Sequence, residues 1–291
     1  MPSRNIIALL TDFGLADAYV GIMKGVMLDI NPTAYFVDIS HQVPPQDVRT
    51  AAFLLGTAYP YFPKDTVYLV IVDPGVGGPR RAVALATPKA FFVAPDNGVL
   101  SYVLSSEQQE IPSTGVPTTE DPFTTMVEVP LTPPLRAVHL TDPRWWRPEI
   151  SATFHGRDIF APVAAHISRG VPLEEIGMPI DRLLAFPIPR PRRMPDGTLE
   201  GRIIHIDRFG NLITNIMRAD LPEGPVVVVL GRQSVVGLSR SYADGQELVA
   251  LIGSAGHLEI AVPNGSAADR LGARVGDIVR VVRGLPNRVV L

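Results

Sequence analysis

The sequence predicts an α/β protein, in which an α/β domain built on a largely parallel sheet precedes a small all-β domain. Two observations carry this prediction. Over the first hundred residues, short apolar runs alternate with segments of helical periodicity, and beyond residue 197 short strand patterns separated by glycine-containing turns replace them. The chain has 291 residues, about twice the usual length of a domain, so we expect two domains.

The N-terminal domain begins with strands and helices in the order βαβαβ, which predicts a parallel sheet covered on both faces. Each predicted strand is an apolar run, and each predicted helix has apolar residues recurring at helical spacing. Strands are predicted over Ile6–Leu10, Tyr35–Ile39, Val67–Val72, Ala82–Ala86 and Phe91–Ala94, and helices over Asp17–Ile30, Asp47–Ala58 and Ile159–Ser168.

Two proline-rich stretches interrupt this pattern. We interpret much of 105–148, which is rich in Pro, Ser and Thr, as a surface excursion or insertion. Residues 187–197 are too proline-dense for a helix or a central strand and are composed like an interdomain linker. We therefore assign residues 1–186 to the α/β domain and residues 198–291 to the β domain.

The β domain is predicted from short strands that are separated by turns containing glycine. These strands lie over Gly201–Asp207, Val226–Leu230, Leu248–Ile252, His257–Val262 and Ile278–Val282.

Composition excludes several classes of function. The 26 basic and 29 acidic side chains leave a net charge of -3, which does not favour nucleic acid as a partner. Cysteine is absent, which removes thiol nucleophiles, disulfides, thiolate zinc sites and iron–sulfur clusters. No apolar run reaches the length of a membrane span, and the first residues lead into a strand instead of a signal peptide, so we expect a cytoplasmic protein without a membrane partner.

Two carboxylates follow predicted strands of the parallel sheet, where ligands of such sheets bind. Asp12 lies in the segment 11–14 (Thr-Asp-Phe-Gly) after the first strand, and Asp73 opens the segment 73–80 (Asp-Pro-Gly-Val-Gly-Gly-Pro-Arg) after the third. Asp12 can accept two hydrogen bonds from a ribose diol, or it can merely cap a turn. Asp73 and Arg80 can flank a ligand that approaches the glycine turn, or they can form an ordinary surface pair.

A histidine and a second carboxylate segment complete the candidates. His155 precedes the last predicted helix of the α/β domain, where it can orient or deprotonate a water. Asp207 opens the segment 207–211 (Asp-Arg-Phe-Gly-Asn), which can hold an ammonium group and stack on a purine, but which is also a good turn sequence. The segment 253–259 is similarly ambiguous. No pair of histidines has the His-x-x-x-His spacing of metal ligands, so no metal is expected.

Taken together and in order, these segments resemble the S-adenosylmethionine (SAM) hydroxide adenosyltransferase family, the SAM hydrolases, which are relatives of the SAM-dependent fluorinase and chlorinase. The resemblance covers nearly the whole chain apart from the proline-rich stretch. The matching segments are Leu10–Gly14, Val72–Gly77 with Arg80, Ala94–Gly98, Phe154–Asp158, Ile206–Asn211 and Ser254–Val262.

The resemblance implies an N-terminal α/β sandwich, a C-terminal β-barrel-like domain and a homotrimer, with SAM held between the N-terminal domain of one subunit and the C-terminal domain of its neighbour. The implied reaction is SAM plus water giving adenosine plus L-methionine, with SAM as the substrate and with no cofactor. Asp73, Arg80 and His155 match the triad around the attacking water. The resemblance implies that Asp12 contacts the ribose diol and that Asp207 and Ser254 contact the methionine amino acid. Phe209, Asn211 and the backbone near Val262 would form the adenine pocket, and Glu259 is a further substrate-binding candidate.

Some choices stay open at the level of the sequence. Whether Arg80 or the adjacent Arg81 faces the site is not settled by the sequence, although the spacing of the motif selects Arg80. In the halogenating relatives a Tyr replaces Asp73 and a Tyr-Ser pair stands at positions 155–156, which favours water over halide as the nucleophile here. A SAM halogenase and a non-catalytic SAM- or adenosine-binding protein are the alternatives.

Overall fold

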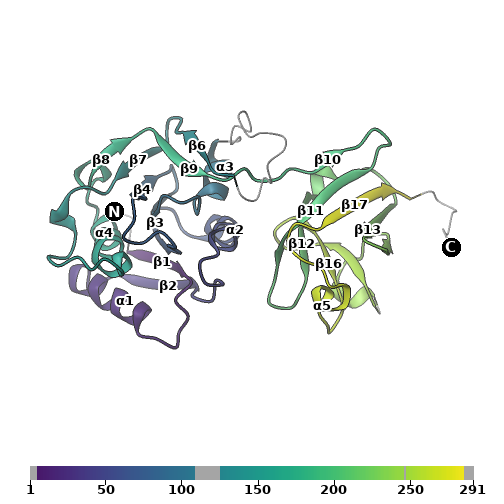
Figure 1. The fold of residues 1–291 in the computed structure, drawn as a ribbon, viewed down its shortest axis with the longest axis horizontal. Coiled ribbons are helices and arrows are strands. Elements are labelled where there is room, and N and C mark those ends of the chain that lie inside the picture. The colour runs from purple at the N-terminus through teal and green to yellow at the C-terminus, as the bar shows by residue number, and fades with distance from the viewer. Residues whose placement is uncertain (1–4, 109–124, 246, 285–291) are drawn as a thin grey trace. The chain divides into compact units, whose positions relative to one another are not determined.

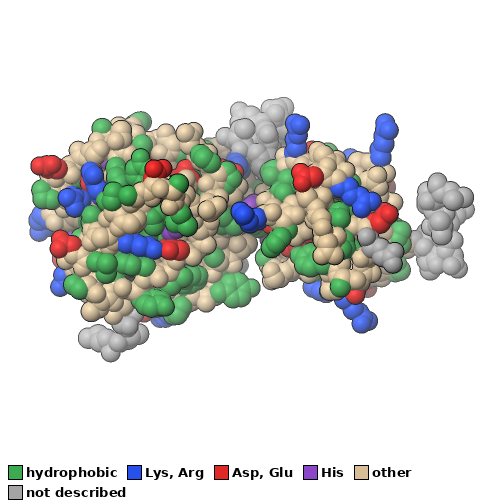
Figure 2. Space-filling view, turned by 90° about the horizontal axis from the view of Figure 1, so that it is seen from below, with side chains coloured by type: hydrophobic (Ala, Val, Ile, Leu, Met, Phe, Trp, Pro, Cys, Tyr) green, Lys and Arg blue, Asp and Glu red, His purple; other side chains and the backbone are tan. Residues whose placement is uncertain are grey.

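The computed structural model describes residues 5–108, 125–245 and 247–284, and it divides the chain into two compact units, Met1–Ile188 and Pro189–Leu291 (Figure 1). The first unit is an α/β sandwich and the second is a barrel-like β domain, which confirms the predicted fold class. On the face that Figure 2 presents, acidic and basic side chains are interspersed on each unit.

A seven-stranded mixed sheet forms the centre of the first unit. Four strands on one side are parallel, and the other three run antiparallel to their neighbours. The strands β3, β4 and β5 are buried along their whole length, because helices cover both faces of the sheet. In order across the sheet the strands are β2 (Tyr35–Ser40), β1 (Ile6–Thr11), β3 (Thr66–Ile71), β5 (Ala90–Pro95), β4 (Ala82–Ala86), β7 (Arg136–His139) and β8 (Met178–Ile180).

Helices α1 (Tyr19–Ile30) and α4 (Ala161–Ser168) pack on one face of this sheet, and α2 (Val48–Ala58) and α3 (Ser101–Gln108) pack on the other. Strand residues alternate between the two apolar cores, as the pleat requires: Ile7 of β1 joins the α1 side and Ala8 joins the α2 side. Helix α2 begins at a capping Asp, as predicted, since Asp47 accepts a hydrogen bond from the backbone N–H of Thr50 at 3.0 Å.

The predicted surface excursion over 105–148 is wrong for a large part of the stretch. Its first residues belong to α3, and β7 is an interior strand of the main sheet with Ala137 and Val138 buried. Strand β6 (Val127–Pro130) pairs with β9 (Arg182–Ala185) in a separate two-stranded sheet. These strands have only four residues each and lie among prolines, one of which, Pro130, ends β6, so their apolar pattern is hidden. Residues 109–124 of this prediction lie outside the described residues.

The second unit is an eight-stranded antiparallel sheet that nearly closes into a barrel. A bridge between Ser239 and Leu251 ties the chain after β14 to β15, at the two ends of the strand order. In that order the strands are β14 (Gln233–Val236), β13 (Val226–Leu230), β17 (Ile278–Arg283), β11 (Leu199–Ile206), β12 (Leu212–Met217), β16 (His257–Ala261) and β15 (Val249–Ile252), with β10 (Arg192–Arg193) paired to β11.

The apolar interior of this barrel is formed by inward-facing residues such as Ile203, Leu212, Val228 and Val279. The short helix α5 (Ala267–Leu271) contributes Ala267 to the same core. Part of the predicted linker therefore belongs to the second unit, because β10 lies within 187–197. Among the residues that the structure describes, no helix is both long and apolar enough to cross a lipid bilayer.

Candidate active site

The two carboxylates predicted at strand ends lie at the same edge of the sheet. Strands β1 and β3 are adjacent and parallel, with Thr11 opposite Ile71, so the residues that follow them emerge side by side. Asp12 comes directly after β1, and Asp73 comes two residues after β3. This edge is where an open α/β sheet binds its ligands.

Asp73 and Arg80 form a buried ion pair across the glycine turn. The Nε of Arg80 donates to both carboxylate oxygens of Asp73 at 3.0 Å, and Nη2 of Arg80 donates to Oδ2 of Asp73 at 2.6 Å. The two side chains are only 6% and 11% exposed, respectively, so water screens this pair little. The guanidinium also lies over the ring of Phe160, at 5.1 Å from its centre, which further fixes its plane.

The neighbouring arginine serves a different carboxylate. Arg81 donates from Nε to Oδ2 of the buried Asp96 at 2.8 Å and from Nη2 to the carbonyl oxygen of Arg182 at 3.1 Å. Asp96 also accepts from the backbone N–H of Leu184 at 2.8 Å, and its pKa is raised by burial despite these contacts. The structure thus brings Arg80, and not Arg81, to Asp73.

His155 joins the Asp73–Arg80 pair through its Nδ1 atom, which lies 2.9 Å from Nη2 of Arg80. A guanidinium can only donate, so Nδ1 accepts, and the neutral ring carries its proton on Nε2. The pKa of His155 is lowered by burial and by the charge of Arg80, against the opposing charges of Asp73 and Asp158. The imidazole is therefore neutral near pH 7 and keeps its Nδ1 lone pair for Arg80.

In the described part of the chain, Arg80 and His155 each keep one nitrogen free to donate. Arg80 occupies both oxygens of Asp73, which leaves that carboxylate as an anchor for the guanidinium. Within the described residues, Nη1 of Arg80 and Nε2 of His155 have no hydrogen-bond partner. Such an arrangement suits an oxygen that carries negative charge, because guanidinium and imidazole N–H groups both donate to it.

Asp12 is held by the loop that precedes α2. Its Oδ2 accepts from the backbone N–H of Gln46 at 2.7 Å, and the N–H of Gly14 donates to the carbonyl of His41 at 2.7 Å. These contacts explain the bent path of the chain after β1, since Gly14 has a φ of 66° and Gln46 a φ of 67°. Asp12 remains partly exposed in this position.

Three aromatic rings connect the Asp12 segment to the His155 segment. The ring of Phe13 lies edge-on to that of Phe154 at 5.9 Å between centres, and both rings contact Tyr19 at the start of α1. Sequence patterns did not single out Tyr19, because it read only as one apolar position of a helix. The aromatic contacts place residues adjacent to Asp12 and His155 within one cluster.

In the second unit, Asp207 organises the turn between β11 and β12. Its Oδ1 accepts from the backbone N–H groups of Phe209 and Asn211, both at 2.9 Å, and its Oδ2 accepts from the side-chain amide of Asn211 at 2.9 Å. The ring of Phe209 is 75% exposed at the tip of this turn. The turn thus presents an aromatic face beside a carboxylate and an amide.

Glu259 is a buried carboxylate of β16 with a partner that the sequence did not reveal. The hydroxyl of Tyr242 donates to Oε2 of Glu259 at 2.8 Å, and a β-carbon built on Gly253 would lie 1.7 Å from Oε1. Burial raises the pKa of Glu259, and burial together with Glu259 raises the pKa of Tyr242 to about 12. The charge of Asp207 acts in the same direction on both groups, so the turn lies near this pair.

The two remaining predicted contacts lie at the ends of β16. Ser254 is exposed in the turn that leads into β16, and Val262 follows the strand, where its carbonyl accepts from the backbone N–H of Gly265 at 3.0 Å. The structure therefore groups Asp73, Arg80 and His155 in one unit and Asp207, Asn211, Tyr242 and Glu259 in the other. Within the described ranges, no three His, Cys, Asp or Glu side chains are grouped as metal ligands would be.

Comparison with known proteins gives matches to both units. The model of the SAM hydroxide adenosyltransferase N-terminal domain matches residues 7–177, and that of the C-terminal domain matches residues 201–280. A protein of Thermus thermophilus named (R)-S-adenosyl-L-methionine hydrolase is 40% identical over 95% of this chain and 99% of its own length. A protein of the same name from Salinispora tropica is 37% identical, over 96% of this chain and 98% of its own length.

More distant relatives and solved structures agree with these matches. A fluorinase of Nocardia brasiliensis is 28% identical over 97% of this chain and 98% of its own length. Among solved structures, a conserved protein of Thermotoga maritima aligns with a TM-score of 0.80 at 35% identity, covering 95% of this chain and 100% of that one.

Proposed function

The chain belongs to the SAM hydroxide adenosyltransferase family, and from this premise we propose that it hydrolyses S-adenosyl-L-methionine to adenosine and L-methionine. The observation that carries the proposal is the arrangement of Asp73, Arg80 and His155, in which Nη1 of Arg80 and Nε2 of His155 remain free to donate. A site of this kind holds a hydroxide ion, or a water that is losing its proton, better than it holds a neutral water.

The reaction makes few demands on its leaving group. Attack at the ribose C5′ displaces methionine as a neutral thioether from a positively charged sulfonium, so no proton has to be delivered to the departing sulfur. The barrier therefore lies in supplying a hydroxide-like oxygen in line with the C5′–S bond. Fixing that oxygen beside the ribose contributes several kcal/mol, on the order of what well-oriented intramolecular reactions gain.

Each residue of the triad has one task in this proposal. Nη1 of Arg80 and Nε2–H of His155 donate to the attacking oxygen and lower the pKa of a bound water. Asp73 holds the guanidinium by two-point contact, and the acceptor Nδ1 of His155 keeps the ring in the tautomer that presents a donor. The proton of the attacking water passes to solvent.

The substrate contacts follow from the family resemblance and from the chemistry of each side chain. Asp12 accepts hydrogen bonds from the ribose diol, and the exposed ring of Phe209 stacks on adenine beside Asn211. Asp207 and Ser254 bind the amino-acid end, the backbone near Val262 completes the adenine pocket, and Glu259 is a further substrate-binding residue. We also propose a homotrimer that acts in the cytoplasm, in which the β unit of a neighbouring subunit completes each site.

Product analysis tests the proposal. We expect purified protein incubated with SAM to form adenosine and methionine in equal amounts. The Asp73→Ala variant should lose turnover but keep measurable SAM binding by calorimetry. Absence of both products would reject the proposal, and tight binding without products would make the protein a SAM-binding protein instead.

A halogenase is the second candidate, because the free donors of Arg80 and His155 also suit a halide ion. The same incubation with added chloride or fluoride distinguishes the two functions. A 5′-halo-5′-deoxyadenosine in place of adenosine would favour the halogenase. We expect adenosine alone, since this chain has Asp73 and His155 where the halogenating relatives have tyrosines.

A further inference from the structure

A fully buried carboxylate lies three residues after His155 and has no task in the proposed chemistry. Asp158 is 0% exposed, in the π-helical turn Gly156–Phe160 that begins directly after His155. Burying an unpaired charge is costly, so a buried carboxylate has to be compensated by donors. The donors that compensate Asp158 come from the chain on both sides of His155.

Four contacts tie Asp158 to the segment that carries His155. Oδ2 of Asp158 accepts from the backbone N–H of Ser151 at 2.8 Å and from Nη2 of Arg157 at 2.9 Å, and Oδ1 accepts from Nε of Arg157 at 2.6 Å. The backbone carbonyl of Asp158 accepts from the N–H of Arg147 at 2.9 Å. The pKa of Asp158 is lowered by Arg157, Ser151 and Arg147, against its burial, so the group is an anion near pH 7.

The same contacts extend to the other side of the site. The guanidinium of Arg157, fixed by Asp158, lies over the ring of Phe154 at 5.3 Å from its centre. Phe154 in turn contacts Phe13, which adjoins Asp12. Asp158 thus holds Arg157 directly and Phe154 through Arg157. His155, which lies between these two residues in the sequence, faces Arg80.

We propose that Asp158 is the positioning residue for His155: by holding Ser151 and Arg157 it keeps the turn around His155 in the shape that aims Nδ1 at Arg80. Its effect on catalysis rests on the proposed hydrolase function, in which His155 must present Nε2–H to the attacking oxygen. Asp158 itself does not touch the reacting atoms in this proposal.

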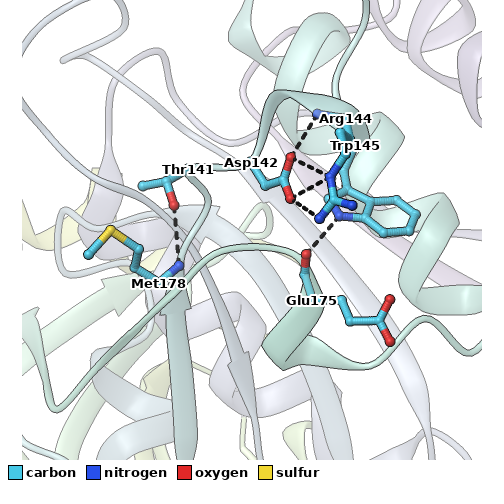
Figure 3. A network of polar contacts seen from close by, with 6 residues as sticks. All are labelled: Thr141, Asp142, Arg144, Trp145, Glu175 and Met178. Atoms are coloured by element: carbon cyan, nitrogen blue, oxygen red, sulfur yellow. Dashed lines mark hydrogen bonds and ion pairs between the residues drawn. The ribbon is translucent and has the colours of Figure 1, made fainter.

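Asp142, which lies before the segment that carries His155, offers a matched control because it also pairs with an arginine close in sequence (Figure 3). Asp142 accepts from the backbone N–H and the guanidinium of Arg144, but both side chains are more exposed than Asp158. The surrounding contacts are the indole N–H of Trp145 donating to the carbonyl of Glu175 at 2.8 Å, and the N–H of Met178 donating to Thr141 at 3.2 Å. None of these contacts involves His155.

The test compares Asp158→Asn, Arg157→Gln and Asp142→Asn with the unaltered protein in two measurements. The first is kcat and KM for SAM hydrolysis, and the second is the ¹⁵N chemical shift of the two ring nitrogens of His155. A displacement of about 1 Å can cost roughly 100-fold in rate. We therefore expect Asp158→Asn to lower kcat by about 10- to 100-fold with KM within about twofold, and to convert the single Nε2–H tautomer into a mixture.

Arg157→Gln should change both measurements in the same direction as Asp158→Asn does. In this variant Asp158 loses its arginine partner, and Phe154 loses the guanidinium that lies over its ring. Asp142→Asn should change neither. The Arg157→Gln variant decides the question if Asp158→Asn does not fold, since the side chain of Arg157 is partly exposed whereas that of Asp158 is fully buried.

Unchanged kcat and unchanged His155 shifts in a folded Asp158→Asn or Arg157→Gln protein would overturn the proposal. A rise in KM at constant kcat would also overturn it, since that result would make Asp158 part of substrate binding. If the unaltered protein does not hydrolyse SAM, the proposed function fails, and the tautomer of His155 in the three variants still tests the positioning role by itself.

Discussion

Residue scale: Arg80 and Arg81 are adjacent and chemically identical, yet they serve different carboxylates. Arg80→Lys should lower kcat by about 100-fold or more, because an ammonium group cannot contact Asp73 at two points and still donate to both His155 and the attacking oxygen. Arg81→Lys is the matched control. Steady-state kinetics with SAM should give it a kcat near that of the unaltered protein, and an equal loss in both variants would contradict the assignment of Arg80.

The lowered pKa of His155 predicts how the site responds to acid. Burial and Arg80 lower this pKa, and Asp73 and Asp158 oppose them. The unfolded chain therefore takes up a proton at a higher pH than the folded chain does, so His155 costs stability as the pH falls below about 6.5 and costs none above it. Protonation also removes the acceptor for Arg80 and sets two cations together.

Titration of the His155 ring by NMR checks this prediction. We expect the folded protein to keep His155 neutral below about pH 6.5, the ordinary value for the side chain. The hydrolysis rate should show no loss attributable to His155 until the pH reaches that lower range. A His155 titration above its ordinary value would contradict the account of the Arg80 contact.

The sequence predicted which residues of the site carry reactive groups better than it predicted which side chains those groups contact. The pairing of Asp73 with Arg80 followed from a turn of eight residues, which is a local feature. The contact between Tyr242 and Glu259 arises only when the barrel brings η6 (Tyr242–Asp244) beside β16, and no local pattern marks it. The choice between the two arginines likewise depended on which carboxylate each one meets across strands.

Element scale: the segment before His155 packs against the glycine turn that carries Asp73. Gly77 has a φ of 76°, and a β-carbon built on it would lie 2.5 Å from the carbonyl oxygen of Ala152. Gly77→Ala should therefore destabilise the protein by about 1–3 kcal/mol through backbone strain, and it should also push the His155 segment away from Arg80 and lower kcat.

Gly170→Ala separates these two effects. Gly170 also has a positive φ, of 94°, but a β-carbon there meets nothing within 4 Å. Chemical denaturation should show destabilisation in both variants, with the larger loss at Gly77, and kinetics should show a loss of kcat at Gly77 alone. Equal kcat in the two variants would mean that the contact with Ala152 does not help to position His155.

At this scale the parallel strands and the antiparallel strand β4 were predictable, and the antiparallel strands β7 and β8 were not. The strands β1, β2 and β3 are apolar runs separated by amphipathic helices, which is the signature of a parallel sheet. The strands β7, β8 and β9 have three or four residues each, and β8 contains Pro179, so they are too short to show a period. The π-helical turn after His155 has no sequence signature of its own.

Whole-molecule scale: the proposed substrate contacts are divided between the two units, with Asp12 in one and Asn211 in the other. The boundary at Ile188 and Pro189 lies inside the predicted linker, because a dense run of prolines is readable from composition alone. How many chains make a site is not a property of local sequence, so the homotrimer with shared sites stays a proposal.

Subunit mixing tests that proposal. An Asp73→Ala chain and an Asn211→Ala chain, each with its own tag, are inactive alone in this account. Co-expressed at equal levels, they should form mixed trimers in which about a third of the sites, one in each trimer, join two unaltered halves. Activity in doubly tagged protein near that fraction supports sites shared between subunits, and activity no higher than that of either variant alone would contradict them.

The central claim is that this protein attacks the C5′ of SAM with an oxygen derived from water. Hydrolysis in ¹⁸O-labelled water, followed by mass spectrometry of both products, measures this directly. The account predicts adenosine carrying one ¹⁸O atom at its 5′ hydroxyl and methionine carrying none. Adenosine without the label, or no adenosine at all, would contradict it.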